Sequence, residues 1–245
     1  MLPGRMPMYE RTASDGIDVV DRWQDGVGWM AHPGEDAERA SHAIAGRDGV
    51  WVFDPLDGPG VDDLLADLGS VAGVAVLSKH HSRDADVFAD RYGVPVHVPA
   101  WMDGVADRVD APVERYDAPP GEWVDLADSG ISVRTVDPTT AWREMVAYRR
   151  ADGTLRVPDM LSSVPAMTVR DERLGCYLLH RLAPPRAAFA DVDPDRIVFG
   201  HGEGVTEDAA AALDAALADA RRNFPFALVS QAPTQVRGVL AALRE

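Results

Sequence analysis

Residues 76–85 read VLSKHHSRDA, and this stretch is the most informative part of the sequence. It follows an apolar segment and places two histidines, two cations and one carboxylate within the six positions from Lys79 to Asp84. Polar clusters at strand ends are where α/β proteins build their binding and catalytic sites. We therefore expect a functional site at the end of a strand over 73–77.

The hydrophobic pattern around this stretch predicts alternating strands and helices. Apolar residues at positions i, i+3, i+4 and i+7 predict a helix over 61–68, and a second helix is expected over 84–92. Short apolar runs predict strands over 49–53 and 94–98 on either side of the central strand. These segments form a β-α-β-α-β unit, whose strands pair in parallel.

The rest of the chain is predicted to contain further strands and a helical C-terminus. Asp152-Gly153 is a strong hairpin signal between two strand patterns. The expected strands are 28–31, 40–45, 122–126, 131–136, 144–148, 155–157 and 195–199, and the expected helices are 207–222, with Thr206 as its cap, and 233–244.

The composition is that of a compact soluble protein. With 245 residues, 46% of them hydrophobic, the chain can bury a large core, and we expect an N-terminal arm or edge strand over 1–25 and one domain of two β lobes over 26–245. No apolar run reaches the roughly 20 residues of a membrane helix, and no signal-peptide core follows the N-terminus, so we predict a cytoplasmic location. The single cysteine, Cys176, excludes an internal disulfide and a thiolate metal cluster.

The charge balance is strongly acidic and almost free of lysine. The net charge is −16, and Lys79 is the one lysine among 24 basic residues. Such a surface suits a protein that stays hydrated in concentrated salt, where screening removes self-repulsion. We hypothesise the cytosol of a halophile that accumulates salt; an arginine-biased, GC-rich genome is the alternative. Whatever its origin, a strongly negative net charge argues against nucleic acid or an anionic membrane as a partner.

Three segments of the sequence resemble the signature of the metallo-β-lactamase superfamily. The family's first motif, Thr-His-x-His-x-Asp-His, aligns with residues 78–84; a later aspartate aligns with Asp159 in VPDML, and a last His-Gly aligns with His201-Gly202 in VFGHGE. The resemblance covers residues 26–225 and implies an α/β fold, the αββα sandwich, in which helices cover two mixed sheets. Typical members hold two zinc ions and hydrolyse esters, amides, thioesters or phosphoesters.

The first motif departs from the family's pattern at its ligand positions. Lys79 stands at the first histidine and Arg83 at the aspartate, whereas His81 matches the second histidine. Because a cation repels Zn²⁺, the resemblance implies at most one divalent ion, which would be zinc, iron or manganese. The ligands it implies are His81, Asp84, Asp159 and His201.

Other positions of the pattern are filled only in part. The family's later histidine is missing, and Glu144 or Thr140 stands nearest to its place. His80 or Glu144 would then assist the metal ligands. Asp54, at the end of its strand, aligns with an aspartate that has a structural role in many members.

Two functions are consistent with this sequence. In the first, the chain is a metal-dependent hydrolase for a small anionic ester, thioester or similar molecule, with Asp159 at the reaction centre and with Lys79 or Arg83 binding the anion or stabilising an oxyanion. In the second, it is a non-catalytic pseudoenzyme or a binder of small anions. Lys79 and Arg83 then pair with Asp84, Asp159 and Glu144, and this network replaces the metal ions, so that no cofactor is bound.

Overall fold

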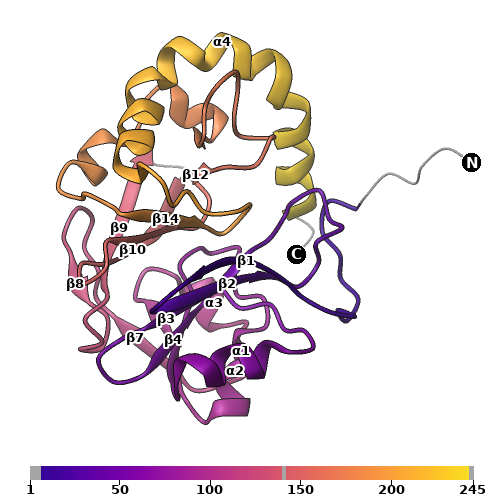
Figure 1. Cartoon of the computed structure of the whole chain (residues 1–245), viewed down its shortest axis with the longest axis vertical. Helices are drawn as coiled ribbons and strands as arrows, with labels where there is room; N and C mark the ends of the chain where they lie inside the picture. The colour runs from indigo at the N-terminus through magenta and orange to yellow at the C-terminus, as the bar shows by residue number, and fades with distance from the viewer. Residues whose placement is uncertain (1–6, 140–141, 243–245) are drawn as a thin grey trace, which may run out of the picture.

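The computed structural model describes residues 7–139 and 142–242, which form two β-sheets with helices on their outer faces (Figure 1). The first sheet and helices α1 to α3 make the indigo-to-magenta half of the molecule, and the second sheet and helix α4 make the other half. This is the α/β sandwich of mixed sheets that the sequence predicted.

The first sheet holds seven strands in sequence order, antiparallel from β1 to β4 and parallel from β4 to β7. The strands are β1 (Asp18–Trp23), β2 (Gly26–Met30), β3 (Ser41–Ala45), β4 (Val50–Phe53), β5 (Val71–Ala75), β6 (Val96–Pro99) and β7 (Val113–Tyr116). The crossovers between the parallel strands contain α1 (Val61–Leu68), α2 (Ala85–Tyr92) and the short α3 (Asp103–Ala106). The predicted β-α-β-α-β unit is thus confirmed, and β1 adds an edge strand within residues 1–25.

The second sheet has the order β14-β11-β10-β9-β8. Its strands are β8 (Val124–Asp125), β9 (Ser132–Thr139), β10 (Trp142–Arg149), β11 (Thr154–Val157) and β14 (Arg196–Phe199). The predicted hairpin at Asp152-Gly153 joins β10 to β11, with Gly153 at φ 63°, where glycine is favoured. Strand β14 then returns to pair in parallel with β11.

Smaller elements connect this sheet to the last helix. They are the two-stranded pair of β12 (Leu161–Ser162) with β13 (Gly175–Cys176), and the 3₁₀ turns η1 (Leu178–Arg181) and η2 (Arg186–Phe189). Cys176 is buried among apolar residues.

Two apolar clusters hold these layers together. The first joins the sheets to each other and to α2, since Trp29 and Val52 of the first sheet belong to the same buried cluster as Met145 of β10. The second lies between the second sheet and α4, where Phe199 and Leu213 are buried together. The loops that leave both sheets therefore start from fixed points, which is what a precise site requires.

The C-terminal helix α4 runs from Ala209 to Ala242, so the prediction of two helices, over 207–222 and 233–244, was wrong. Pro225 removes one backbone donor from this helix. The helix nevertheless continues, because Ala227 and Gln231 are buried on its inner side and Gln231 donates a 2.7 Å hydrogen bond to the carbonyl of Thr168. The predicted end at residue 244 lies outside the described residues.

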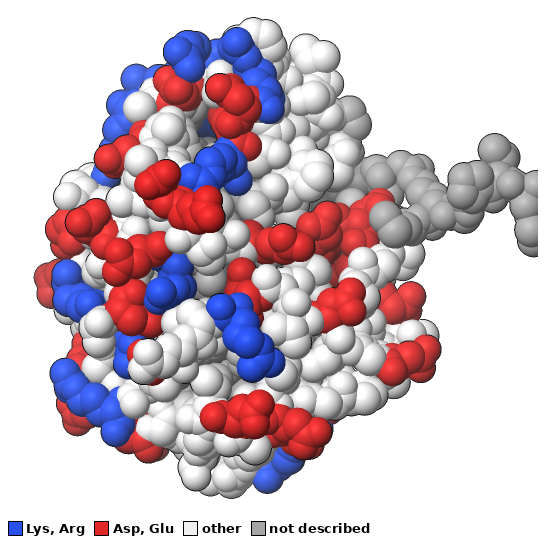
Figure 2. All heavy atoms as spheres, viewed as in Figure 1, with Lys and Arg blue, Asp and Glu red and all other residues white. Residues whose placement is uncertain are grey.

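On the face shown in Figure 2, acidic side chains are spread over both halves of the molecule, with basic side chains between them. Among the described residues, no helix combines the length and the apolar composition that crossing a bilayer requires.

Candidate functional site

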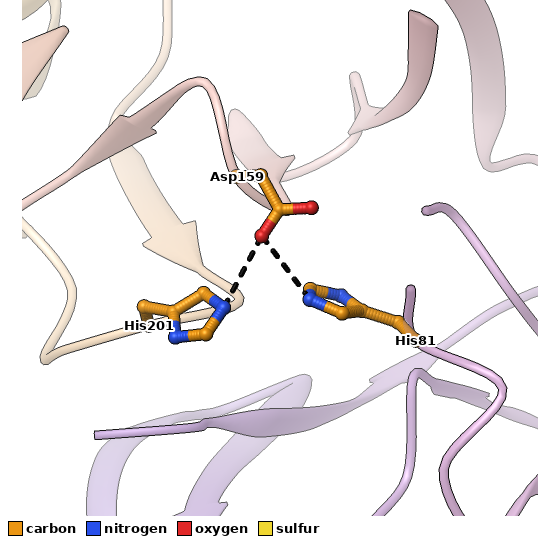
Figure 3. Close-up of side chains that lie close together, drawn as sticks. All are labelled: His81, Asp159 and His201. Carbon is orange, nitrogen blue, oxygen red and sulfur yellow. Dashed lines mark ion pairs between the residues drawn. The ribbon is translucent and has the colours of Figure 1, made fainter. Parts of the chain in front are cut away.

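Three predicted site residues converge where the two sheets meet (Figure 3). The Nε2 atoms of His81 and His201 lie 3.1 Å and 3.2 Å from the same oxygen, Oδ1 of Asp159. Each residue offers one ligand atom, and these three atoms lie within 4.8 Å of one another. The site is therefore compact enough for a single metal ion to contact all three.

The topology explains why these three residues meet. His81 follows β5 in the loop before α2, Asp159 follows β11, and His201 follows β14. Because β11 and β14 are parallel neighbours, with Val157 opposite Phe199, the loops after them leave the same edge of the second sheet. The loop of His81 leaves the first sheet beside them, as Figure 3 shows.

The far side of each imidazole ring faces an acceptor. Nδ1 of His81 lies 3.3 Å from Oδ2 of Asp54, and Nδ1 of His201 lies 2.7 Å from the carbonyl oxygen of Ala37. A carboxylate or carbonyl oxygen only accepts, so we assign the ring proton to Nδ1 in both residues. In the neutral rings each Nε2 then presents a lone pair to Oδ1 of Asp159, which is itself an acceptor, so the arrangement is favourable only when a cation, a proton or a metal ion, lies between the atoms.

Asp54 fixes the orientation of His81 from within the core. Its side chain is fully buried, its Oδ1 accepts a 2.8 Å hydrogen bond from the backbone of Leu77, and its Oδ2 lies 2.9 Å from Nη2 of Arg156. Burial alone would raise the pKa of this carboxyl, but Arg156 and His81 outweigh it and lower the pKa to about 2. Asp54 is therefore a permanent negative charge beside His81.

Arg156 is the residue of this site that the sequence interpretation missed. Its guanidinium is fully buried on β11. The negative charges of Asp159 and Glu144 also stabilise its charged form. The missed signal is the arginine itself: a charged residue in the middle of a buried apolar strand almost always has a charged partner. The resemblance drew attention to Asp159 and left Arg156 without a role.

Arg83 is bound mainly by backbone carbonyls. Its Nη1 donates to the carbonyls of Ala40 and Asp54, at 2.8 Å and 2.9 Å, and its Nη2 donates to that of Gly200, at 3.1 Å. Nη2 also lies 3.3 Å from Nε2 of His81. Burial lowers the pKa of Arg83 to about 10, although the charge of Asp54 opposes that shift. Among the described residues, its hydrogen bonds go to carbonyls of both halves of the molecule rather than to the carboxylates that the sequence suggested.

Lys79 and Asp84, the other predicted residues of the first motif, lie outside the three-residue group. The Lys79 side chain is exposed, and its carbonyl accepts a hydrogen bond from Nη2 of Arg108. Asp84 stands at the start of α2, and its Oδ2 accepts a 2.7 Å hydrogen bond from the backbone of Asp57. Of the four predicted metal ligands, His81, Asp159 and His201 lie together. Asp84 instead binds the backbone of the neighbouring loop at Asp57.

Glu144 lies on β10 next to the site, and both of its carboxylate oxygens accept hydrogen bonds from neighbouring protein groups. Its Oε1 accepts a hydrogen bond from the backbone of Met160 at 3.1 Å, and its Oε2 accepts one from the indole of Trp142 at 2.9 Å. Burial, followed by the negative charge of Asp159, raises the pKa of Glu144 well above its ordinary value. His80 is exposed, and Thr140 lies outside the described residues.

A cavity of about 690 Å³ reaches Arg83, although none of His81, Asp159 and His201 lines it. Arg83 and Asp84 form part of its wall, and Arg91, which pairs with Asp57 and Asp62, forms another part. The remaining lining residues are Glu10, Arg11, Thr12, Ala13, Ser14, His32, Arg39, Leu56, Gly58, Pro59, Gly60 and Val87. Because Arg83 contacts both His81 and the cavity, it is the link between the two.

Comparison with known proteins places the fold. No protein-family model matches the sequence, and a search of curated proteins found no match. Solved structures do match: DIM-1 metallo-β-lactamase exposed to ceftazidime has a TM-score of 0.60 at 11% identity, over 86% of this chain and 99% of that one. The chain has the metallo-β-lactamase fold.

Two further structures with this fold show the same extent of similarity. The metallo-β-lactamase from Hirschia baltica matches with a TM-score of 0.55 at 12% identity, over 84% of this chain and 98% of that one. FIM-1 from Pseudomonas aeruginosa, solved in a mono-zinc form, matches with a TM-score of 0.55 at 13% identity, over 87% and 98% of the two chains. The predicted metallo-β-lactamase fold is thus confirmed over most of the chain.

Proposed function

We propose that this chain is a hydrolase that uses one divalent metal ion bound by His81, Asp159 and His201. The observation that supports this proposal is the convergence of two Nε2 atoms on one carboxylate oxygen, at 3.1 Å and 3.2 Å. Two imidazole nitrogens and one carboxylate suit zinc, iron or manganese and leave coordination positions open for water and substrate. An ion held there would supply Lewis acidity, which polarises a carbonyl and acidifies water.

The protein's own groups would prepare this chemistry. Asp54 and the carbonyl of Ala37 keep the two imidazole rings in the orientation that presents Nε2. Asp159 supplies the negative charge that the ion needs; burial would raise its pKa, but His81 and His201, when they carry a proton at Nε2, hold that pKa well below its ordinary value. All three side chains are at most 17% exposed, so their electrostatic interactions are stronger than they would be in open solvent.

For the substrate we propose a small anionic ester, thioester or similar molecule. Four hydrogen bonds or close contacts already engage the two terminal nitrogens of Arg83, which leaves this guanidinium little capacity for a substrate anion. Lys79 is exposed and stands two positions before His81. We therefore assign anion recognition to Lys79 and a supporting role to Arg83.

The alternative function is that of a metal-free pseudoenzyme or small-anion-binding protein. The observation in its favour is the fully buried pair of Arg156 and Asp54, with the guanidinium of Arg83 close by. These two arginines balance the charges of Asp54 and Asp159 without any metal ion, so the site is electrostatically tolerable when empty.

A hydrolysis assay separates the two functions. Chelator-treated protein is supplied with Zn²⁺, Fe²⁺ or Mn²⁺ and tested on matched anionic and neutral esters and thioesters. We expect metal-dependent turnover that Asp159→Asn and His201→Ala abolish, and a higher KM for the anionic substrates in Lys79→Ala. His97→Ala is the matched control, because His97 packs on Trp51, away from the site. Protein that binds metal and hydrolyses nothing, or whose turnover ignores metal, would contradict the proposal.

A further inference from the structure

The Nε2 atom of His81 lies close to more groups than it can bind at one time. It lies 3.1 Å from Oδ1 of Asp159 and 3.3 Å from Nη2 of Arg83. With the ring proton on Nδ1, beside Asp54, Nε2 has one lone pair, which accepts either an N–H of Arg83 or a metal ion. The same atom cannot do both at once.

From this geometry we propose that Arg83 gates the metal site: its guanidinium occupies His81 and must release it before the ion binds. This inference rests on the proposed function, because it concerns the same three ligands. Arg83 also opposes the ion through its charge, since two positive groups a few ångströms apart in a poorly hydrated site repel each other strongly.

The groups around Arg83 hold its guanidinium in place, and the adjoining cavity leaves room for it to move. The carbonyls of Ala40, Asp54 and Gly200 bind it from three different segments, so it stays beside His81 when no ion is present. On its other side lies the cavity of about 690 Å³, whose wall includes the carboxylates of Asp57 and Asp84. A guanidinium displaced from His81 would therefore move toward negative charge rather than into an apolar core.

The gate predicts that removing the charge of Arg83 strengthens metal binding. The measurement is the Kd for Zn²⁺, from competition with a chromophoric chelator, on the whole chain after metal removal. Arg83→Gln should bind Zn²⁺ about tenfold more tightly than the wild type, or better. Arg91→Gln is the matched control: it removes an arginine from the same cavity, but one that pairs with Asp57 and Asp62, and its Kd should stay within about twofold of the wild type.

A melting curve checks that each variant is folded. If Arg83→Gln does not fold, Arg83→Lys takes its place. An ammonium keeps a cation near the carbonyls but lacks the planar fork that also reaches His81, so this variant should bind Zn²⁺ more tightly than the wild type, by less than about tenfold. A folded Arg83 variant with an unchanged or weaker affinity, in a chain whose wild type binds Zn²⁺, would overturn the gate alone. If neither the wild type nor a folded variant binds Zn²⁺, the proposed function falls with it.

Discussion

Nη2 of Arg156 lies 2.9 Å from Oδ2 of Asp54, and neither side chain is exposed to solvent. Arg156 belongs to β11 of the second sheet and Asp54 follows β4 of the first, so this ion pair crosses the interface between the sheets. The same Asp54 orients His81. The pair therefore connects the packing of the two halves to the geometry of the candidate metal site.

Breaking this pair should be costly. Arg156→Met leaves Asp54 charged and unpaired in the core, and we expect a loss of about 3–5 kcal/mol in the free energy of unfolding. Urea denaturation measures it. Adding Asp54→Asn should recover much of the loss, because the unpaired charge disappears. The exposed pair of Arg222 and Asp219 gives the control: Arg222→Met should cost about 0–1 kcal/mol. Equal costs for the two arginines would contradict this account.

Arg83 should behave differently from Arg156 in the same experiment. Arg83→Met removes the donor to the carbonyl of Ala40, at a cost of about 1–3 kcal/mol, whereas the carbonyls of Asp54 and Gly200 keep Ser41 Oγ and the backbone N–H of Ala40 as donors. We therefore expect destabilisation that Asp159→Asn does not repair, whereas a direct pair between Arg83 and Asp159 would make the double variant recover. Double-mutant cycles on metal-free protein, followed by urea denaturation, distinguish the two results.

The stability of the second half should weaken in acid through Glu172. Burial would raise the pKa of this carboxyl, but hydrogen bonds from Arg181 and Asn223 outweigh it and lower the pKa below its ordinary value of 4.5. A depressed pKa stabilises the fold above the unfolded value and loses that contribution as the pH falls through the folded one. The deficit of Glu172→Gln in the free energy of unfolding should therefore be full near pH 7 and shrink below about pH 4.5. A deficit independent of pH would argue against an ionised Glu172.

Salt should stabilise this chain if the acidic surface is an adaptation. Lowering the salt from 1 M to 0.01 M lengthens the screening distance from about 3 Å to about 30 Å and exposes the repulsion of a net charge of −16. We expect the Tm to fall by about 5 °C or more on desalting. Scanning calorimetry across that range measures the fall. A Tm that is constant across it would favour genomic bias as the origin of the composition.

Local patterns predicted much of the fold because they depend on near neighbours. The apolar spacing over 61–68 predicted α1 with its observed bounds, Val61–Leu68, and Asp152-Gly153 predicted the β10–β11 hairpin. The continuity of α4 through Pro225 was not predictable in this way, because distant contacts such as that of Gln231 with Thr168 support the helix there.

The site was predictable where it depends on strand ends and unpredictable where it depends on long-range contacts. The family resemblance implied His81, Asp159 and His201 as ligands, and the structure brings them together because each follows a strand and loops at one edge of a sheet lie close together. The carbonyls that hold Arg83 come from residues 40, 54 and 200 and have no signature in side-chain identity. A comparison of motifs depends on side-chain identity and therefore cannot detect backbone acceptors of this kind.

The metal content of protein purified without chelators tests the central claim most directly. Elemental analysis should find close to one equivalent of zinc, iron or manganese per chain, lost in Asp159→Ala and His201→Ala and retained in His97→Ala, whose imidazole contacts Trp51 instead. Two equivalents, or none even after incubation with these ions, would contradict a single-ion site built from His81, Asp159 and His201.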